Sequence, residues 1–257
     1  MKHATRQFSL FVIASAMLIA GLLSACSARD PTQAQAAATT EGVAPAVDIA
    51  VADPAHAEAD LSDTDGVAAD RSTPVDKYQP LANGTQIFYA YMALSGEKPD
   101  YEPIAIHLYS LYKDEQDQFK RRDLLEAATQ VIDEEIQKAK GSRYFVMKTP
   151  TALGPYDFAS KSFPINAITE DGMSFSFSGP ASSYSLAFNN AAAYSAVVVE
   201  DENTARALEE IRATTGGLYT MKLYFFAAGV QSGTRVLRVE ITKVEMLDDK
   251  GRIIITI

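Results

Sequence analysis

Aromatic side chains are confined to the later part of this chain, and their distribution limits where a hydrophobic core can form. Residues 77–257 contain all twelve tyrosines and ten of the twelve phenylalanines. The preceding segment, 27–76, contains no aromatic residue. Because large apolar side chains supply most of the area that folding buries, we expect one folded domain over residues 77–257, long enough to bury a sizeable core.

The segment 27–76 is also acidic, with ten acidic residues against two basic ones, a net charge of −8. Low hydrophobicity combined with high net charge cannot offset the entropy lost on ordering, so we predict a disordered tether over residues 26–76. Residues 77–257 carry 19 basic and 23 acidic residues, a net charge of −4. They show no basic patch, and we therefore expect no nucleic-acid partner.

The N-terminus has the order of features typical of a secretory signal peptide, which we predict over residues 1–25. Lys2 and Arg6 precede an uncharged, mostly apolar run of 18 residues, 8–25, that ends in small side chains. This run is also at the lower limit for a transmembrane helix. The basic or aromatic residues that commonly flank a membrane anchor are missing after it, which favours the signal peptide.

The run ends in Leu23-Ser24-Ala25-Cys26, which resembles the lipobox of bacterial lipoproteins. The resemblance implies cleavage before Cys26, a diacylglycerol on its sulfur and a fatty acid such as palmitate on its new amino group. Two or more acyl chains give stable anchoring. Ser27, where an Asp would imply retention at the inner membrane, implies the periplasmic face of the outer membrane. The alternative is an ordinary signal peptide with a chance cysteine.

The first part of the domain has helical periodicity, and the rest alternates as strands do. We expect a helix over 203–217 with Asn203 or Thr204 as its N-cap, and a β-bulge near Thr242–Lys243. Strand 252–257 is expected inside the sheet, with a free docking edge as the alternative. The fold class is therefore predicted as α+β, with a mostly antiparallel sheet and one short inserted helix. The helices are predicted over 85–94, 103–112 (Pro103 in the first position) and 115–140 (Asp114 or Asp117 as the cap, Gly141 at the end), and the strands over 143–149, 172–179, 184–189, 193–200, 218–227, 234–247 and 252–257.

Two further stretches, "FKRRDLL" at 119–125 and "LGPYDF" at 153–158, resemble a group of bacterial lipoproteins with a tether and a β-rich C-terminal part. This resemblance implies no particular activity. "FKRR" is interpreted as a solvated helix face, with an anionic partner as the alternative.

Few residues suggest catalysis or metal binding. His107 is the only histidine of the domain. Its spacing from Ile104, Leu108 and Leu111 predicts a structural histidine near an apolar helix face. One histidine and no domain cysteine cannot complete a usual zinc site, so no metal is expected. The run 200–202 is interpreted as acidic residues at a helix N-terminus, with a cation site as the alternative.

Other candidates have a structural and a functional interpretation. Asp157 is predicted to shape a turn, although burial beside aromatic residues would raise its pKa. Five tyrosines at helical spacing are interpreted as core rather than as a surface that stacks on a glycan or peptide. "NGT" at 83–85 matches a glycosylation sequon by chance. The five tyrosines are Tyr89, Tyr91, Tyr101, Tyr109 and Tyr112.

The sequence shows no nucleotide-binding motif and no evident nucleophile–base pair, so we expect no catalytic residue and no cofactor. The interpretation that follows is a non-enzymatic binding or scaffolding lipoprotein of the cell envelope, with an envelope protein or a glycan as its partner. The alternative is an envelope hydrolase that acts on peptidoglycan or lipid through Asp/Glu or Ser/Lys chemistry. Two carboxyl groups facing each other across a deep cleft would favour the hydrolase, and a free sheet edge would favour the binding module.

Overall fold

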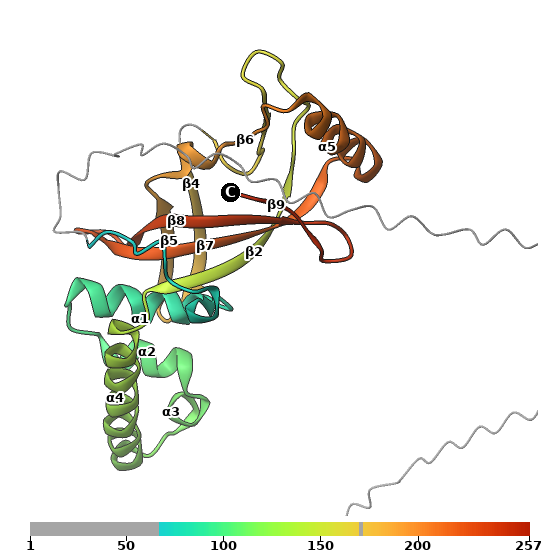
Figure 1. Cartoon of the computed structure of the whole chain (residues 1–257). Helices are drawn as coiled ribbons and strands as arrows, with labels where there is room; N and C mark the ends of the chain where they lie inside the picture. The colour runs from blue at the N-terminus through green and yellow to red at the C-terminus, as the bar shows by residue number, and fades with distance from the viewer. Residues whose placement is uncertain (1–66, 170–171) are drawn as a thin grey trace, which may run out of the picture. The chain divides into compact units, whose positions relative to one another are not determined.

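The computed structural model describes residues 67–169 and 172–257 (Figure 1). The predicted signal peptide, Cys26 and most of the predicted tether lie outside these residues. The fold is α+β, as the sequence predicts: after the two-residue strand β1 come four helices, the rest of a mostly antiparallel sheet follows, and one helix is inserted between strands. The helices are α1 (Gly84–Ser95), α2 (Tyr101–Leu108), α3 (Ser110–Asp114), α4 (Gln118–Lys140) and α5 (Glu202–Thr215), with 3-10 turns at η1 (Val75–Lys77) and η2 (Ala191–Tyr194).

Within the described residues, seven strands form one mixed sheet in the order β1-β2-β7-β8-β5-β4, and β9 also pairs with β8. The pairs β1/β2 and β5/β8 are parallel, and the others are antiparallel. β3 and β6 form a separate antiparallel pair. The strands are β1 (Gln79–Pro80), β2 (Tyr144–Ala152), β3 (Ser162–Pro164), β4 (Met173–Gly179), β5 (Ser182–Phe188), β6 (Ala196–Val198), β7 (Leu218–Gln231), β8 (Val236–Leu247) and β9 (Ile253–Thr256).

One edge of β8 is shared by two strands. β5 pairs with its first residues, from Val236 to Val239, and β9 pairs with its last, from Glu245 to Leu247. Asn190 fills the interval between them: its Nδ2 donates to the Ile241 carbonyl at 2.9 Å, and its Oδ1 accepts from the Ile241 N–H at 2.8 Å. A side-chain amide therefore satisfies backbone groups that no strand reaches.

The predicted β-bulge is confirmed. Tyr224 pairs with Lys243 and Phe225 with Ile241, so Thr242 is the extra residue on β8. Its Oγ1 donates to the Tyr224 carbonyl at 3.1 Å. The bulge changes the alternation of β8, so that Ile241 and Val244 are both fully buried.

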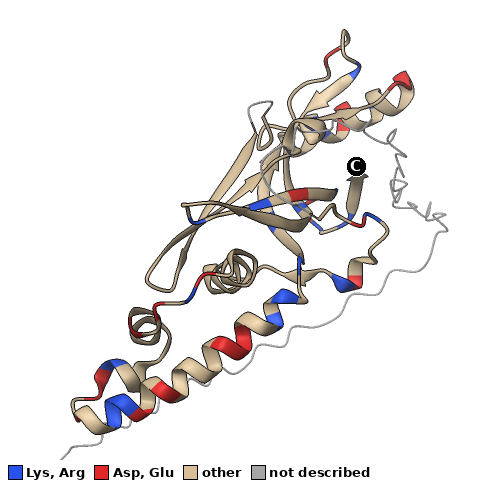
Figure 2. Ribbon diagram, turned by 90° about the vertical axis from the view of Figure 1, so that its left-hand side faces the viewer, with Lys and Arg blue, Asp and Glu red and all other residues tan. Residues whose placement is uncertain are grey.

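The core lies between one face of the sheet and α1, which contacts β4, β5, β7 and β8. α4 packs against α1, so the helices form a further layer below the sheet in Figure 1. Ile132 and Ile136 of α4 are buried, whereas its charged residues, which Figure 2 shows spread along the helix, are exposed or half-buried. Val131, expected on the apolar face, is 43% exposed.

The predicted helix over 103–112 is wrong in its details. It is divided at Tyr109, whose φ of −123° is not helical, into α2 and α3. α2 begins at Tyr101, so Pro103 is its third residue and not its first. The division also moves Leu111 off the apolar face, and this side chain is 76% exposed. Apolar spacing that continues across the break therefore did not correspond to one continuous helix.

Side-chain caps fix the helix starts. Asn83 caps α1 by accepting from the backbone N–H groups of Thr85 and Gln86, and Gln86 Oε1 accepts in return from the Asn83 N–H. This is the capping box, and it gives a structural role to the Asn of "NGT". Asp117 caps α4 as predicted, and Gly141 follows its last residue. The predicted cap of α5 is wrong, because Asp201 holds that position.

The C-terminal strand is not inside the sheet, contrary to expectation. β9 pairs with β8 alone among the described strands. Ile255 is buried against the core, whereas Ile253, beyond a register shift, is 45% exposed. β9 therefore has one paired and one unpaired edge within the described part of the chain.

Candidate functional site

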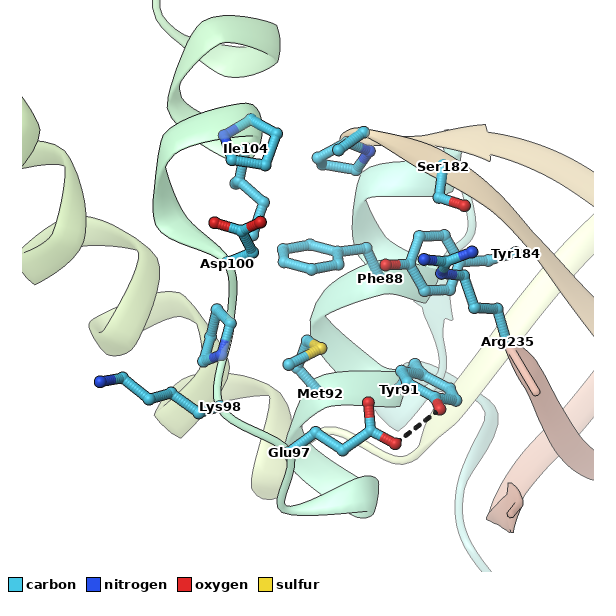
Figure 3. A pocket seen from close by; sticks show the side chains of 14 residues that line it. Phe88, Tyr91, Met92, Glu97, Lys98, Asp100, Ile104, Ser182, Tyr184 and Arg235 are labelled. Carbon is cyan, nitrogen blue, oxygen red and sulfur yellow. Dashed lines mark hydrogen bonds between the residues drawn. The ribbon is translucent and has the colours of Figure 1, made fainter. Parts of the chain in front are cut away.

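A pocket of about 330 Å³ lies where the helical part of the domain meets the tips of two strand connections (Figure 3). One wall is the connection between α1 and α2, with Lys98, Pro99 and Asp100. The opposite wall is the β4–β5 turn, with Pro180 and Ala181, together with Arg235 just before β8. The volume is at the lower end of the range for small-molecule sites.

The floor of the pocket is apolar and belongs to the core. Phe88, Met92 and Ile104 line it, and their exposed fractions are 1%, 7% and 4%. Two tyrosines complete it, Tyr91 and Tyr184, whose rings pack with centroids 5.5 Å apart. Such buried side chains are held by their neighbours, so the floor is rigid.

Tyr91 fixes one side of the pocket. Its hydroxyl oxygen is 2.5 Å from the Thr234 carbonyl and 3.1 Å from Glu97 Oε1. The hydroxyl proton is shared between these two acceptors. Burial raises the pKa of Tyr91, and the Glu97 carboxylate raises it further. The hydroxyl therefore stays protonated near neutral pH and connects the α1–α2 connection to the β7–β8 loop.

Arg235 is positioned by the parallel pairing of β5 with β8, because its carbonyl accepts from the Ser185 N–H at 3.0 Å. Its guanidinium lies next to the Tyr184 side chain (Figure 3). Burial raises the pKa of Tyr184, while the charge and hydrogen bond of Arg235 lower it. Within the described residues, Arg235 has no carboxylate within 4.0 Å, so its charge is not neutralised by a salt bridge.

Asp100 is the corresponding free carboxylate of the opposite wall. It precedes α2 in the N-cap position, yet its side chain accepts no capping hydrogen bond. It also forms no salt bridge with any residue that the structure describes. Figure 3 shows Asp100 and Arg235 on opposite sides of the pocket, with Phe88 between them.

The turn that forms the rim is strained. Gly179 pairs with Ser182, which leaves Pro180 and Ala181 as a two-residue loop. Ala181 has φ +60°, a left-handed conformation that is costly for a residue with a Cβ. Gly179 cannot be replaced by a larger residue without a shift, because a Cβ there would lie 2.7 Å from the Tyr184 ring. Backbone strain of this kind is often found beside ligand sites.

A second polar cluster lies on the other face of the sheet. Glu245, 4% exposed, accepts from Tyr224 at 2.9 Å, Lys222 at 3.3 Å and Lys243 at 2.6 Å. Burial alone would raise the pKa of Glu245, but these donors lower it overall. Burial and the Glu245 carboxylate raise the pKa of Tyr224 to about 12. Every polar group of the cluster is paired, so it stabilises the sheet and leaves nothing for a ligand.

The histidine prediction is wrong. His107 is exposed in the last turn of α2, because the apolar face on which it was placed does not continue past Tyr109. Asp157 shapes a turn as predicted, accepting from the Ala159 N–H at 3.0 Å and from Ser160 Oγ at 2.6 Å. Asp157 is exposed, so the condition for a raised pKa is not met, and these hydrogen bonds lower its pKa.

The acidic run 200–202 has the helix-start role predicted for it. Asp201 accepts from the Thr204 N–H at 2.7 Å and from Thr204 Oγ1 at 2.6 Å, and these bonds lower its pKa. In the described part of the chain, no group of three or more His, Cys, Asp or Glu residues could hold a metal ion. Over the same residues, no helix has the length and apolar character needed to span a bilayer.

The five helical tyrosines belong to the core or pack against it, as the core interpretation predicts. "FKRR" is mostly solvated, and even Phe119 is 74% exposed. Arg121 is the exception, because it lies 4.2 Å from the Tyr112 ring centroid and forms a salt bridge with Glu102 at 3.2 Å. The pocket itself was not predicted. Asp100, Ser182 and Arg235 are far apart in the sequence, and none of them belongs to a recognisable motif.

Comparison of the chain with protein-family models, with curated proteins and with solved structures found no match. The candidate site therefore depends on its geometry alone. It offers an apolar floor, opposite charges on opposing walls and several hydroxyl groups, which suits a small polar ligand with an apolar part.

Proposed function

We propose that this chain is a non-enzymatic binding lipoprotein of the bacterial cell envelope, anchored through Cys26, and that the pocket between Asp100 and Arg235 is its ligand site. The anchor follows from the resemblance of Leu23–Cys26 to a lipobox. The binding role is supported chiefly by one observation, which is that two opposite charges line a preformed pocket and neither is neutralised by a salt bridge within the described residues.

The arrangement of carboxylates favours binding over hydrolysis. Paired carboxylates that act as acid and base stand on opposite sides of a reacting bond. Here Glu97 and Asp100 belong to the same short connection, and Glu97 accepts a hydrogen bond from Tyr91. The wall opposite them offers Arg235, which can bind an anion but cannot accept a proton at neutral pH. The edge of β9 that no described strand pairs with is the other feature expected of a binding module.

The proposal is tested by blocking the pocket. Ser182 lines it, whereas Ser183 is exposed and points to the other face of the same strand. We expect small-molecule ligands that raise the Tm of the lipid-anchored protein in mild detergent to lose that effect in Ser182→Phe and to keep it in Ser183→Phe. Ligands recovered after incubation should have unchanged mass.

Two results would contradict the proposal. Ligands that raise the Tm of Ser182→Phe as much as that of the wild type would place the binding site elsewhere. Recovery of a ligand with a hydrolysed bond, at a rate abolished by Ser182→Phe, would assign the pocket to an enzyme.

A further inference from the structure

The charges of the pocket specify the kind of molecule that fits it, and the inference drawn from them rests on the proposed function. A guanidinium and a carboxylate that share a site normally pair with each other or with neighbours. In this pocket they stand apart, with the Phe88 side chain between them (Figure 3). A ligand that carries both charges can pair with each of them at once.

The Arg235 side of the pocket is suited to an anion. The guanidinium offers several N–H donors in a fork that matches a carboxylate. Ser182 and Tyr184 line the same side of the pocket, and both carry hydroxyl groups. Their two side chains are two residues apart on β5 and therefore share one face of the strand.

The Asp100 side is suited to a cation. Asp100 makes neither a capping hydrogen bond nor a salt bridge in the described part of the chain. Glu97 belongs to the same connection, but its carboxylate points toward Tyr91 and accepts the hydrogen bond of that hydroxyl (Figure 3). Lys98 also lines the pocket, but Figure 3 shows its amino group pointing away from Phe88. The Asp100 carboxylate is therefore the group of this side that can pair with a ligand's cation.

The middle of the pocket is apolar but offers no aromatic face. Phe88, Tyr91 and Tyr184 have exposed fractions of 1%, 3% and 5%. A sugar ring stacks on an exposed ring face, which these residues lack, so a glycan gains little here. The prolines of the two walls, Pro99 and Pro180, and the edge of Phe88 suit a small aliphatic group instead.

We infer that the pocket binds a small zwitterion of the amino-acid or short-peptide class. Its carboxylate lies at Arg235, its ammonium at Asp100 and its aliphatic part over Phe88. The volume of about 330 Å³ limits the ligand to one or two residues at a time.

The test uses three matched ligands: the dipeptide leucyl-alanine, its N-acetyl form without the ammonium, and its C-terminal amide without the carboxylate. Binding to the lipid-anchored protein in detergent is measured by calorimetric titration. A charged hydrogen-bonded contact is worth enough to change Kd by about tenfold or more. We expect the free dipeptide to bind at least about tenfold more tightly than either blocked form.

Two variants connect each charge of the ligand to its residue. Arg235→Gln should weaken binding of the free dipeptide by about tenfold and leave the affinity for the C-terminal amide unchanged. Asp100→Asn should also weaken binding of the free dipeptide by about tenfold, but leave the affinity for the N-acetyl form unchanged. Arg206→Gln and Asp249→Asn, exposed and remote from the pocket, are the controls. Melting curves check that every variant is folded.

The outcomes separate this inference from the proposed function. If Ser182→Phe abolishes binding of other ligands while leucyl-alanine does not bind, the pocket is a ligand site and the zwitterion class is wrong. Tighter binding of glycerophosphoethanolamine than of leucyl-alanine would overturn the peptide class in favour of a lipid headgroup. Equal binding of all three dipeptide forms would overturn the charge assignment.

Discussion

The side-chain amide of Asn190 forms two hydrogen bonds with the backbone of Ile241, as the backbone of a neighbouring strand would. Both bonds, at 2.9 Å and 2.8 Å, connect the carboxamide to the backbone of β8. Tyr194 adds a third, its hydroxyl donating to the Ile241 carbonyl at 3.1 Å. Ile241 is fully buried, so no water can replace the amide.

Removal of this side chain should be costly. Asn190→Ala leaves a buried N–H without a partner, and we expect a loss of about 2–3 kcal/mol in the free energy of unfolding. Urea denaturation measures it. Asn190→Asp restores the acceptor but not the donor, so it should recover only part of the loss. Asn203→Ala, at an exposed position in α5, should change stability by less than about 0.5 kcal/mol. An Asn190→Ala variant as stable as this control would show that the amide is dispensable.

The left-handed residue at the pocket rim predicts an unusual order of substitutions. Ala181→Val places a β-branched side chain at φ +60°, and we expect a loss of about 1–2 kcal/mol. Ala181→Gly relieves the strain but adds freedom to the unfolded chain, so the two effects nearly cancel, to within about 0.5 kcal/mol. Chemical denaturation of both variants tests this order. A larger loss with Gly than with Val would contradict the assigned backbone conformation.

The buried Glu245 should make stability depend on pH. Its pKa in the folded state is lowered from the ordinary 4.5. A depressed folded pKa means that the stabilisation is complete above pH 4.5 and is lost as the pH falls through the folded value. Glu245→Gln should cost about 2 kcal/mol at pH 7, and the difference from the wild type should shrink toward pH 3. Urea unfolding at several pH values measures this. A difference that does not change with pH would show that the carboxylate charge contributes nothing.

The two isoleucines of β9 should respond very differently to truncation. Ile255 is 1% exposed, so Ile255→Ala should cost about 2–4 kcal/mol. Ile253 is 45% exposed, and Ile253→Ala should cost less than about 1 kcal/mol. Thermal unfolding of the pair compares them. Similar losses at both positions would place the register shift of β9 elsewhere.

The anchor is tested in cells. Cys26→Ser should move the protein out of the membrane fraction and abolish labelling by an alkyne fatty acid, because both depend on the sulfur. Ser27→Ala is the matched control and should remain labelled. A wild-type protein that is unlabelled yet still sediments with membranes would refute the lipobox interpretation.

The elements could be predicted from the sequence because each depends on local periodicity. Alternation gave the long strands and the bulge at Thr242, where Val244 falls out of phase with Ile241. The predicted strand over 193–200 is wrong in its extent, because Ala191–Tyr194 form a 3-10 turn and only Ala196–Val198 pair as β6. The three-residue and four-residue spacing in α4 placed Ile132 and Ile136 on its buried face. Errors arose where the pattern continued across a break in the backbone, as at Tyr109.

The pocket could not be predicted, for a different physical reason. Its charged residues, Asp100 and Arg235, come from connections whose sequences carry no periodicity. They line one pocket because α1 packs on β4, β5 and β8 and because β5 pairs with β8 in parallel, and no local pattern records these distant contacts. The edge position of β9 was missed for the same reason, since the strand order of a sheet is a property of distant contacts.

β8 pairs with β7 and β9, which are close to it in the sequence, and with β5, which is distant, and this difference affects the order of folding. β7, β8 and β9 are consecutive in the chain, so their antiparallel pairing closes only short loops. The parallel pairing of β5 requires the whole segment with β6 and α5 to be looped out first. Arg235 and Ser182 come together only in that later step, through the bond from the Ser185 N–H to the Arg235 carbonyl. Occupancy of the pocket would therefore report complete assembly of the sheet, and a ligand would stabilise the finished domain against every state in which β5 is undocked.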